Sequence, residues 1–298
     1  MANFDTSFFK GEYREGFYIE EMMKRAWAVE IDILEEIDRI CKAHNIQYFA
    51  DSGTLLGTVR HKGFIPWDDD VDIVMLREDY ERFVSIAKEE LPVGYVMADA
   101  CTVGEETSRV LNTAYINFSK QHLEKFYGCP YIVGVDIFPL DNVPKNKDEE
   151  EFVCEVIYLL KRVFSTVKEE DIESKLAEKM LLQLEESLGL KFDEKLSIPS
   201  RIIEQKEKVS MAYQMDICEE VTLWDWFVNH KNYRFKREWY AESILMPFEN
   251  IKIPVPKNYR EVLIAIYGED YLTPVKNTQS HEYPFYKKQK QFVESERG

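Results

Sequence analysis

The chain has 298 residues, of which 45% are apolar and 13% aromatic, a composition that supports a sizeable core and excludes a wholly disordered protein. Its 38 Lys and Arg residues against 55 Asp and Glu residues give a formal net charge of −17, which argues against nucleic acid or an anionic membrane surface as a partner. We find no apolar run of membrane-spanning length and no secretory signal, and we therefore expect a soluble, cytoplasmic protein without a membrane span.

The first 145 residues alternate between helical and strand patterns. From Glu20 to His44, apolar residues recur every three or four positions, which predicts an amphipathic helix. Two shorter helices are expected at Leu55–His61 and Asp79–Leu91. Strands are expected between and after these helices, at Ile46–Ala50, Asp70–Met75, Gly94–Ala98, Arg109–Phe118 and Tyr131–Phe138. This alternation predicts an α/β (α+β) core over residues 1–145, with a mixed sheet flanked by helices.

The rest of the chain changes in composition. Residues 146–238 begin with a charged stretch that is poor in Gly and Pro and has helical spacing, which predicts a mostly helical accessory lobe. Residues 239–298 regain Pro and Gly turns, and we expect this C-terminal segment to pack back on the core. The last dozen residues, KKQKQFVESERG, are expected to form a frayed tail.

The most informative segment is Asp68-Asp69-Asp70-Val71-Asp72. On a strand, residues two apart share a face, so Asp70 and Asp72 point the same way, and Asp68 joins them if the chain is already extended there. Asp69 is expected to face away. Carboxylates this close repel one another unless a cation neutralises them, and oxygen ligands without clustered His or Cys favour Mg²⁺ or Mn²⁺. A solvated acidic turn is the alternative, but the apolar residues that follow indicate a strand entering the core.

A further carboxylate, Asp136, stands alone in an apolar run from Tyr131 to Leu140. An unpaired charge in such surroundings is costly, so we expect the side chain to find a cation. If its strand neighbours that of Asp70 and Asp72, Asp136 completes a three-carboxylate metal site. A helix cap or a structural ion pair is the alternative role.

Gly53 and Thr54 form a turn that opens a predicted helix. A helix N-terminus offers free backbone N–H groups and a positive dipole end to a phosphate. Such a turn is often only a helix cap, but here it lies close in sequence to the acidic segment and is followed by Arg60 and His61. These residues predict a phosphate cradle, in which Arg60 can hold two oxygens and His61 either contacts the phosphate or supports a neighbour.

The motifs together resemble those of the LicD family of cholinephosphotransferases, which belong to the nucleotidyltransferase-fold superfamily. The superfamily pattern of a Gly-Ser/Thr turn, an acidic-x-acidic strand and a later acidic residue is matched by Gly53-Thr54, Asp70-Val71-Asp72 and Asp136. The longer family match includes GTLLG at 53–57, RHKGFIPWDDDVDIVM at 60–75, DIFPLD at 136–141 and His281. The resemblance covers about residues 20–145 and 240–285 and does not extend to the helical lobe.

The resemblance implies a nucleotidyltransferase-like fold and a metal-dependent transferase activity. Members of the family move a phosphoalcohol, typically phosphocholine from CDP-choline, to a sugar hydroxyl of a cell-surface glycan such as lipopolysaccharide or teichoic acid; related proteins use other CDP-alcohols, and the motifs do not specify which. In such a reaction Asp70, Asp72 and Asp68 would hold Mg²⁺ or Mn²⁺. Asp136 would bind a second ion or accept the proton of the attacking hydroxyl.

Further site residues follow from the substrates that the resemblance implies. Gly53, Thr54 and Arg60 would hold a donor phosphate, and His281 is a candidate by resemblance alone. A choline headgroup favours aromatic faces, although core packing is the commoner role of such rings. The aromatic candidates for this contact are Trp67, Tyr48, Trp224, Trp226, Tyr283 and Phe285.

Two other functions fit the same residues. A nucleotidyltransferase that leaves an NMP group on a small hydroxyl acceptor would give a product of different mass. A catalytically inactive module that binds a glycan or nucleotide would release no CMP from a CDP-alcohol, and the intact carboxylates argue against this alternative.

Overall fold

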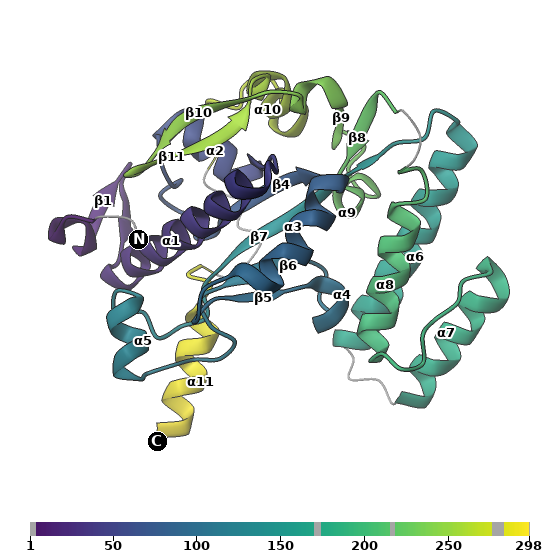
Figure 1. Cartoon of the computed structure of the whole chain (residues 1–298), viewed down its shortest axis with the longest axis horizontal. Coiled ribbons are helices and arrows are strands. Elements are labelled where there is room, and N and C mark those ends of the chain that lie inside the picture. The colour runs from purple at the N-terminus through teal and green to yellow at the C-terminus, as the bar shows by residue number, and fades with distance from the viewer. Residues whose placement is uncertain (1–3, 170–173, 215–217, 276–282, 298) are drawn as a thin grey trace. The chain divides into compact units, whose positions relative to one another are not determined.

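The structure is a computed structural model that describes residues 4–169, 174–214, 218–275 and 283–297. It has mixed α/β architecture, which confirms the predicted fold class (Figure 1). The chain forms two compact units, one of residues 1–97, 109–137 and 240–298, and a second of residues 98–108 and 138–239. We expected a helical lobe to begin at residue 146, whereas the second unit takes up the chain from residue 138 and includes residues 98–108.

The sheet that carries the acidic segment is built around strand β4. Its neighbouring strands are hydrogen-bonded in the order β3 (Phe49–Ala50), β4 (Asp72–Leu76), β7 (Gly134–Asn142), β6 (Ser108–Leu111) and β5 (Val96–Ala98). Strand β4 lies between β3, to which it is antiparallel, and β7. Ile73, Val74 and Met75 are fully buried, so the hydrophobic effect holds this strand in the core of the first unit.

The first unit surrounds its strands with helices, the longest of which is α1. The predicted helix at Glu20–His44 is confirmed as α1 (Glu21–His44), which ends at Asn45 in the left-handed conformation. Figure 1 shows α1 alongside the strands, and it packs on α3. The other helices of this unit are α2 (Ser52–His61), α3 (Arg77–Glu90), α5 (Lys120–Lys125), α10 (Tyr259–Tyr267), α11 (Lys287–Arg297) and a 3₁₀ turn η1 (Thr6–Phe9).

Two hairpins complete this unit and meet at Glu249. They are β1 (Glu12–Arg14) with β2 (Phe17–Ile19), and β10 (Ser243–Phe248) with β11 (Ile251–Pro256). The Arg14 guanidinium forms a bidentate pair with the Glu249 carboxylate, which also accepts the N–H of Phe64. Since the N–H of Glu249 donates to the Lys62 carbonyl, one residue joins both hairpins to the loop that leads to the acidic segment.

The prediction of a frayed tail is contradicted by helix α11. Its Gln289 side chain accepts the N–H of Ile132 and donates to the carbonyl of the same residue. Tyr286, just before the helix, stacks on Tyr131 with ring centroids 4.9 Å apart. These contacts order a polar segment whose own sequence carries no strong folding signal.

The second unit is mostly helical. Its elements are α4 (Ala100–Val103), α6 (Lys147–Glu169), α7 (Ser174–Leu188), α8 (Ile198–Ser210), α9 (Trp224–Phe227), β8 (Glu220–Thr222) and β9 (Arg234–Lys236), and a 3₁₀ turn η2 (Arg237–Tyr240) follows β9. Helices α6 and α8 pack side by side around buried apolar residues that include Leu160 and Ile202 (Figure 1). Lys206 is buried and forms an ion pair with Asp225, which lowers the pKa of that carboxyl.

Several predicted strands are shorter in the structure. The strand expected at Ile46–Ala50 is reduced to β3, and that at Arg109–Phe118 to β6. The second of these ends where the Asn112 side chain donates to the carbonyl of Tyr131 and accepts the N–H of Val133. A side chain that bonds backbone in this way replaces part of a strand ladder, a choice that periodicity does not reveal.

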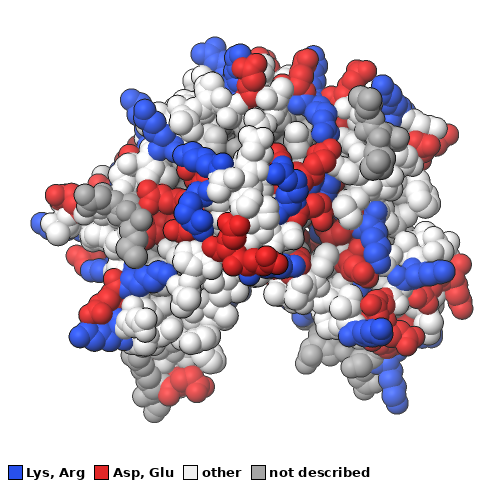
Figure 2. Space-filling model, viewed as in Figure 1, with Lys and Arg blue, Asp and Glu red and all other residues white. Residues whose placement is uncertain are grey.

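On the face shown in Figure 2, positive and negative side chains are mixed. Lys and Arg side chains are interspersed there with Asp and Glu. Among the described residues, no helix has the length and apolar character needed to cross a bilayer.

We expect Glu249→Gln to destabilise the first unit. The Glu249 side chain is 9% exposed and that of Arg14 is 27% exposed, so loss of the charge leaves the shielded guanidinium with only the more exposed Glu12 as its carboxylate partner. A loss of about 2 kcal/mol in the free energy of unfolding is expected, measured by urea denaturation. Glu242→Gln is the matched control, because its pair with Lys257 is exposed and should contribute less than about 1 kcal/mol. Equal losses in the two variants would contradict this role of Glu249.

Candidate active site

The acidic segment forms a loop rather than the start of a strand. Strand β4 begins at Asp72, so the prediction that Asp70 lies on this strand is wrong. The N–H of Asp68 donates to the Ile65 carbonyl, which turns the chain before it reaches the strand. One carboxylate oxygen from each of Asp68, Asp69 and Asp70 nevertheless lies within 4.8 Å of the others. The turn at Pro66 and Trp67 lies just before these residues, and their side chains gather ahead of the strand.

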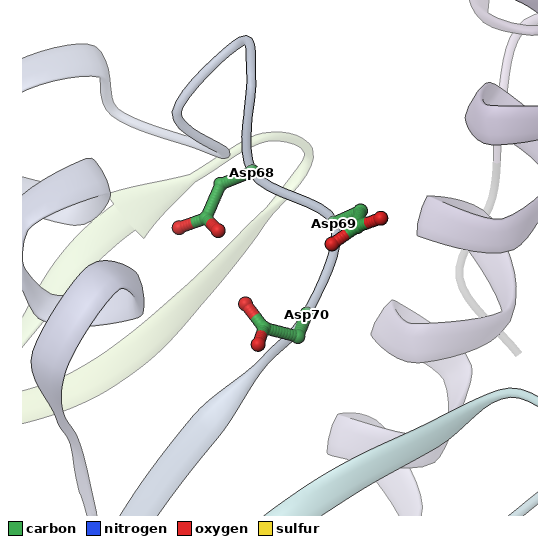
Figure 3. A group of neighbouring side chains, drawn as sticks. All are labelled: Asp68, Asp69 and Asp70. Atoms are coloured by element: carbon green, nitrogen blue, oxygen red, sulfur yellow. The ribbon is translucent and has the colours of Figure 1, made fainter. Parts of the chain in front are cut away.

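The three aspartates of this loop differ in direction. Figure 3 shows Asp68 and Asp70 with their carboxylates on the same side of the loop, whereas Asp69 turns toward the other side. Asp69 is buried and accepts the N–H of Phe285, which ties the loop to the C-terminal segment. Asp68 and Asp70 are thus the better placed pair for a shared ligand, with Asp69 in a supporting position.

Burial and mutual repulsion raise the pKa values of two carboxyls in this segment, Asp68 and Asp72. Burial, followed by the charge of Asp70, raises the pKa of Asp68. Burial also raises the pKa of Asp72, and the charges of Asp70 and then Asp136 add to this effect. The sequence therefore brings four acidic residues of one segment and one distant acidic residue into a single electrostatic group.

A residue that the sequence analysis missed, Glu30, faces the same group from helix α1. Its side chain is 1% exposed, and among the described residues its Oε2 atom has no hydrogen-bond partner. Burial and then the charges of Asp70 and Asp69 raise the pKa of Glu30. A charged residue on the buried side of an otherwise apolar helix stretch was a signal that could have identified it.

Asp136 lies on the strand beside the acidic segment and is paired with an arginine. Its backbone N–H donates to the carbonyl of Val71, which places β7 next to the loop and β4. The Asp136 carboxylate accepts two hydrogen bonds from the Arg109 guanidinium, at 2.6 and 3.1 Å. The predicted proximity to the acidic strand and the alternative of an ion pair are therefore both present, and nothing in the pattern around Arg109 identified it as the partner.

Helix α2 presents its N-terminus to the acidic loop. It begins at Ser52, so Gly53 and Thr54 lie in its first turn rather than before it. The backbone N–H groups of a first turn have no acceptor within the helix. A Cβ atom on Gly53 would lie 2.4 Å from Oδ2 of Asp68, so glycine is required for this close approach. The Thr54 hydroxyl accepts the N–H of Asp72 at 2.9 Å and thereby fixes α2 to β4. Thr54 is thus a structural link, and only its backbone is available to a phosphate.

The residue before this helix, Asp51, is a second buried carboxyl that the sequence analysis missed. Its side chain is 1% exposed, accepts the Ser52 hydroxyl and has no partner for Oδ1 among the described residues. Burial raises the pKa of Asp51 to about 6.

Arg60 and His61 lie at the other end of α2. The Arg60 guanidinium donates to the Tyr271 carbonyl, and burial lowers its pKa while Glu15 and Asp68 act in the opposite direction. The His61 ring has its Nε2 3.3 Å from Glu15 and lies edge-on to Trp67. Arg60 is therefore within electrostatic reach of the acidic loop. His281, a site residue expected by resemblance alone, lies outside the described residues.

The residues present fit a hard divalent cation. Among the described residues, the group that could hold a metal ion consists of Asp68, Asp69 and Asp70. Its donor atoms are all carboxylate oxygens, with no His nitrogen or Cys sulfur. Burial and then repulsion raise the pKa values of Asp68 and Asp72, and a bound cation would offset the repulsion. This donor chemistry is that of Mg²⁺ or Mn²⁺ sites.

Comparison with known proteins agrees with this geometry. Residues 45–170 match the profile of the LicD/FKTN/FKRP nucleotidyltransferase domain. The chain is 27% identical over 257 residues to the lipopolysaccharide cholinephosphotransferase LicD of Haemophilus influenzae, covering 84% of this chain and 91% of that protein. An uncharacterized protein of Rickettsia typhi is 41% identical over 63 residues, 21% of this chain and 20% of its own length.

The acidic loop before strand β4, which faces the N-terminus of helix α2, lies within the matched nucleotidyltransferase domain together with Asp136. The chain is a transferase. The domain at residues 45–170 is of the LicD type, and the chain resembles the LicD protein of Haemophilus influenzae over most of its length, as its motifs led us to expect.

We expect Gly53→Ala to weaken divalent-cation binding with little change in stability. The added Cβ would displace the Asp68 carboxylate, whereas the backbone at this position accepts alanine and helix propensity favours it by up to about 1 kcal/mol. Gly57→Ala in the same helix is the control, because its Cβ would lie 2.5 Å from the Gly63 carbonyl oxygen and should lower stability instead. Calorimetric Mn²⁺ titration and thermal melting separate the two effects. Unchanged Mn²⁺ affinity in Gly53→Ala would contradict the role of Asp68.

The raised pKa of Asp51 makes stability depend on pH. The folded protein keeps this carboxyl protonated up to about pH 6, whereas the unfolded chain ionises it near pH 4, so the folded state binds more protons in this window. The free energy of unfolding therefore falls as pH rises through the window, by at most about 3 kcal/mol for this group. Asp51→Asn cannot ionise and should gain stability over the wild type with rising pH, measured by urea unfolding with a chelator present. A difference that stays constant with pH would show that Asp51 does not titrate in this way.

Proposed function

We propose that this chain is a metal-dependent phosphotransferase that moves a phosphoalcohol, phosphocholine in the first instance, from a CDP-activated donor to a sugar hydroxyl of a cell-surface glycan. The observation that carries the proposal is the group of carboxylates around Asp70 facing the N-terminus of α2, within the domain matched by the family. The choline and lipopolysaccharide parts are supported by the Haemophilus relative, a lipopolysaccharide cholinephosphotransferase that the chain matches over 91% of that relative's length.

Asp70, Asp72 and Asp68 would hold Mg²⁺ or Mn²⁺. When bound, such an ion offsets negative charge on the donor diphosphate and on the departing CMP. The backbone N–H groups of the first turn of α2 would bind a phosphate oxygen, since the helix N-terminus carries a partial positive charge. Arg60 could add a second positive group from the far end of the same helix.

The transfer itself needs a base and an acceptor. The sugar hydroxyl forms a new O–P bond to the phosphorus that carries the alcohol, the bond from that phosphorus to the oxygen of CMP breaks, and the hydroxyl proton goes to a base. Asp136 is the candidate base, and the bidentate pair with Arg109 would fix the direction of its carboxylate. Ligation of a second ion is the other role open to Asp136.

The partners proposed here are a CDP-alcohol and a glycan or glycolipid acceptor. The net charge of −17 and the mixed charge on the face shown in Figure 2 disfavour nucleic acid as a partner. Purified protein incubated with Mg²⁺ and CDP-choline, CDP-ethanolamine or CDP-ribitol should release CMP from one donor, with lipopolysaccharide or teichoic acid as the acceptor. Mass spectrometry of the acceptor distinguishes a phosphoalcohol adduct from the nucleotidyl adduct of the alternative reaction. Absence of CMP release from all three donors would favour a non-catalytic module.

We expect Asp70→Asn and Asp72→Asn to lower the transfer rate at least about 100-fold, because an amide does not offset the charge of a bound cation. Thermal stability should stay the same or rise, since each substitution removes like-charge repulsion. Asp148→Asn, at an exposed position in the first turn of α6, is the control and should keep full activity. Wild-type rates in excess EDTA would refute the metal requirement.

A further inference from the structure

Three half-buried aromatic side chains meet beside the acidic loop. Phe17 comes from strand β2, Trp67 directly precedes Asp68, and Tyr283 lies in the C-terminal segment. The Phe17 ring centroid is 5.1 Å from that of Tyr283 and 6.5 Å from that of Trp67. We call Phe17, Trp67 and Tyr283 the aromatic corner. The sequence analysis named Trp67 and Tyr283 among six candidates and missed Phe17.

The rings of the aromatic corner are steeply inclined to one another. Phe17 and Tyr283 meet at 83° and Phe17 and Trp67 at 67°, so the ring planes face different directions. Rings that only fill a core are normally enclosed, and this is the case for Tyr48 at 5% and Trp224 at 3% exposure. All three corner rings instead keep part of their surface accessible. Inclined, accessible rings are the arrangement that surrounds a bulky cation with negative ring faces.

The aromatic corner lies in a negative environment. Burial and then the charges of Asp69, Glu20 and Asp68 raise the pKa of the Tyr283 phenol, which shows that these carboxylates act on this ring. The loop and the corner are also joined covalently and by hydrogen bonding, since Trp67 adjoins Asp68 and the N–H of Phe285 donates to Asp69. A cation in the corner would therefore be attracted by both ring faces and nearby carboxylates.

The hydroxyl of Tyr283 is a second, independent sign of a ligand. It is shielded from solvent and, among the described residues, has no hydrogen-bond partner. A buried hydroxyl without a partner is costly in a folded protein, and an oxygen of a bound molecule would satisfy it.

We propose that the aromatic corner of Phe17, Trp67 and Tyr283 binds the quaternary ammonium group of the donor, next to the carboxylates that serve the phosphates. The assignment rests on the proposed function for the identity of the donor, but its geometry is independent of catalysis. A quaternary ammonium cannot donate a hydrogen bond and depends on ring faces for binding. A primary ammonium can instead donate hydrogen bonds to carboxylates. A neutral polyol gains little from either feature.

Binding of phosphocholine tests the aromatic corner without requiring turnover. Line broadening of its trimethyl proton signal gives a Kd for the wild type, for Phe17→Leu and for Tyr283→Leu. Each Leu variant should bind about tenfold more weakly, as expected for the loss of one ring face. Tyr283→Phe keeps the ring and should retain most of the affinity for the cation. Phosphoethanolamine should bind the wild type more weakly and be insensitive to Phe17→Leu.

Tyr18→Leu is the matched control. Tyr18 is the next residue of the same strand and is 52% exposed, and its ring packs on Tyr13 rather than on the corner. Its loss should leave the phosphocholine Kd unchanged, and thermal melting checks that all variants fold. Equal affinities in the wild type and in both folded Leu variants would overturn the assignment, as would equal binding of phosphoethanolamine.

Donor kinetics separate this proposal from the proposed function. The kcat/KM ratio of CDP-choline to CDP-ethanolamine should fall about tenfold in Phe17→Leu. If the wild type transfers phosphocholine and this ratio does not change, the aromatic corner is refuted and the phosphotransferase stands. If phosphocholine binds at the corner but no CDP-alcohol is turned over, the phosphotransferase is refuted and the binding site stands.

Discussion

Repulsion between carboxylates held in a shielded loop is the constraint around which this domain is organised. Burial and then the charge of Asp70 raise the pKa values of Asp68 and Asp72, and they raise the pKa of the buried Glu30 in the same way. A fold that keeps such groups together must compensate through bonds elsewhere. The Thr54 hydroxyl on the N–H of Asp72 and the N–H of Phe285 on Asp69 are two of these restraints.

The restraints come from both ends of the chain. Glu249 joins the N-terminal hairpin through Arg14 to the loop near Phe64, while Gln289 of α11 holds the strand region at Ile132. The acidic loop is thus fixed by segments more than two hundred residues apart in sequence. Such tertiary restraint keeps carboxylates in place for a cation that the unfolded chain could not bind in this geometry.

The features of the candidate active site are distributed unevenly between the two units of the chain. The carboxylates, the helix N-terminus and the aromatic corner all belong to the first unit. The second unit contributes helices α6, α7 and α8. Of these, α6 (Lys147–Glu169) lies within the segment matched by the family model. The matched segment ends at residue 170, so residues 171–239 of the second unit lie outside it.

The sequence alone determined the fold class, the long helix α1 and the segment that carries the site, because periodicity and local motifs encode these directly. It did not determine that Asp68, Asp69 and Asp70 lie in a loop ahead of β4, because strand periodicity does not encode the hydrogen bond from the Asp68 N–H to the Ile65 carbonyl that turns the chain just before them. Nor could it pair Arg109 with Asp136, place Glu30 against the loop or bring Phe17 beside Trp67. Arg109, Glu30 and Phe17 come from segments that meet their partners only when the chain packs. Local sequence patterns do not encode contacts between distant strands and helices.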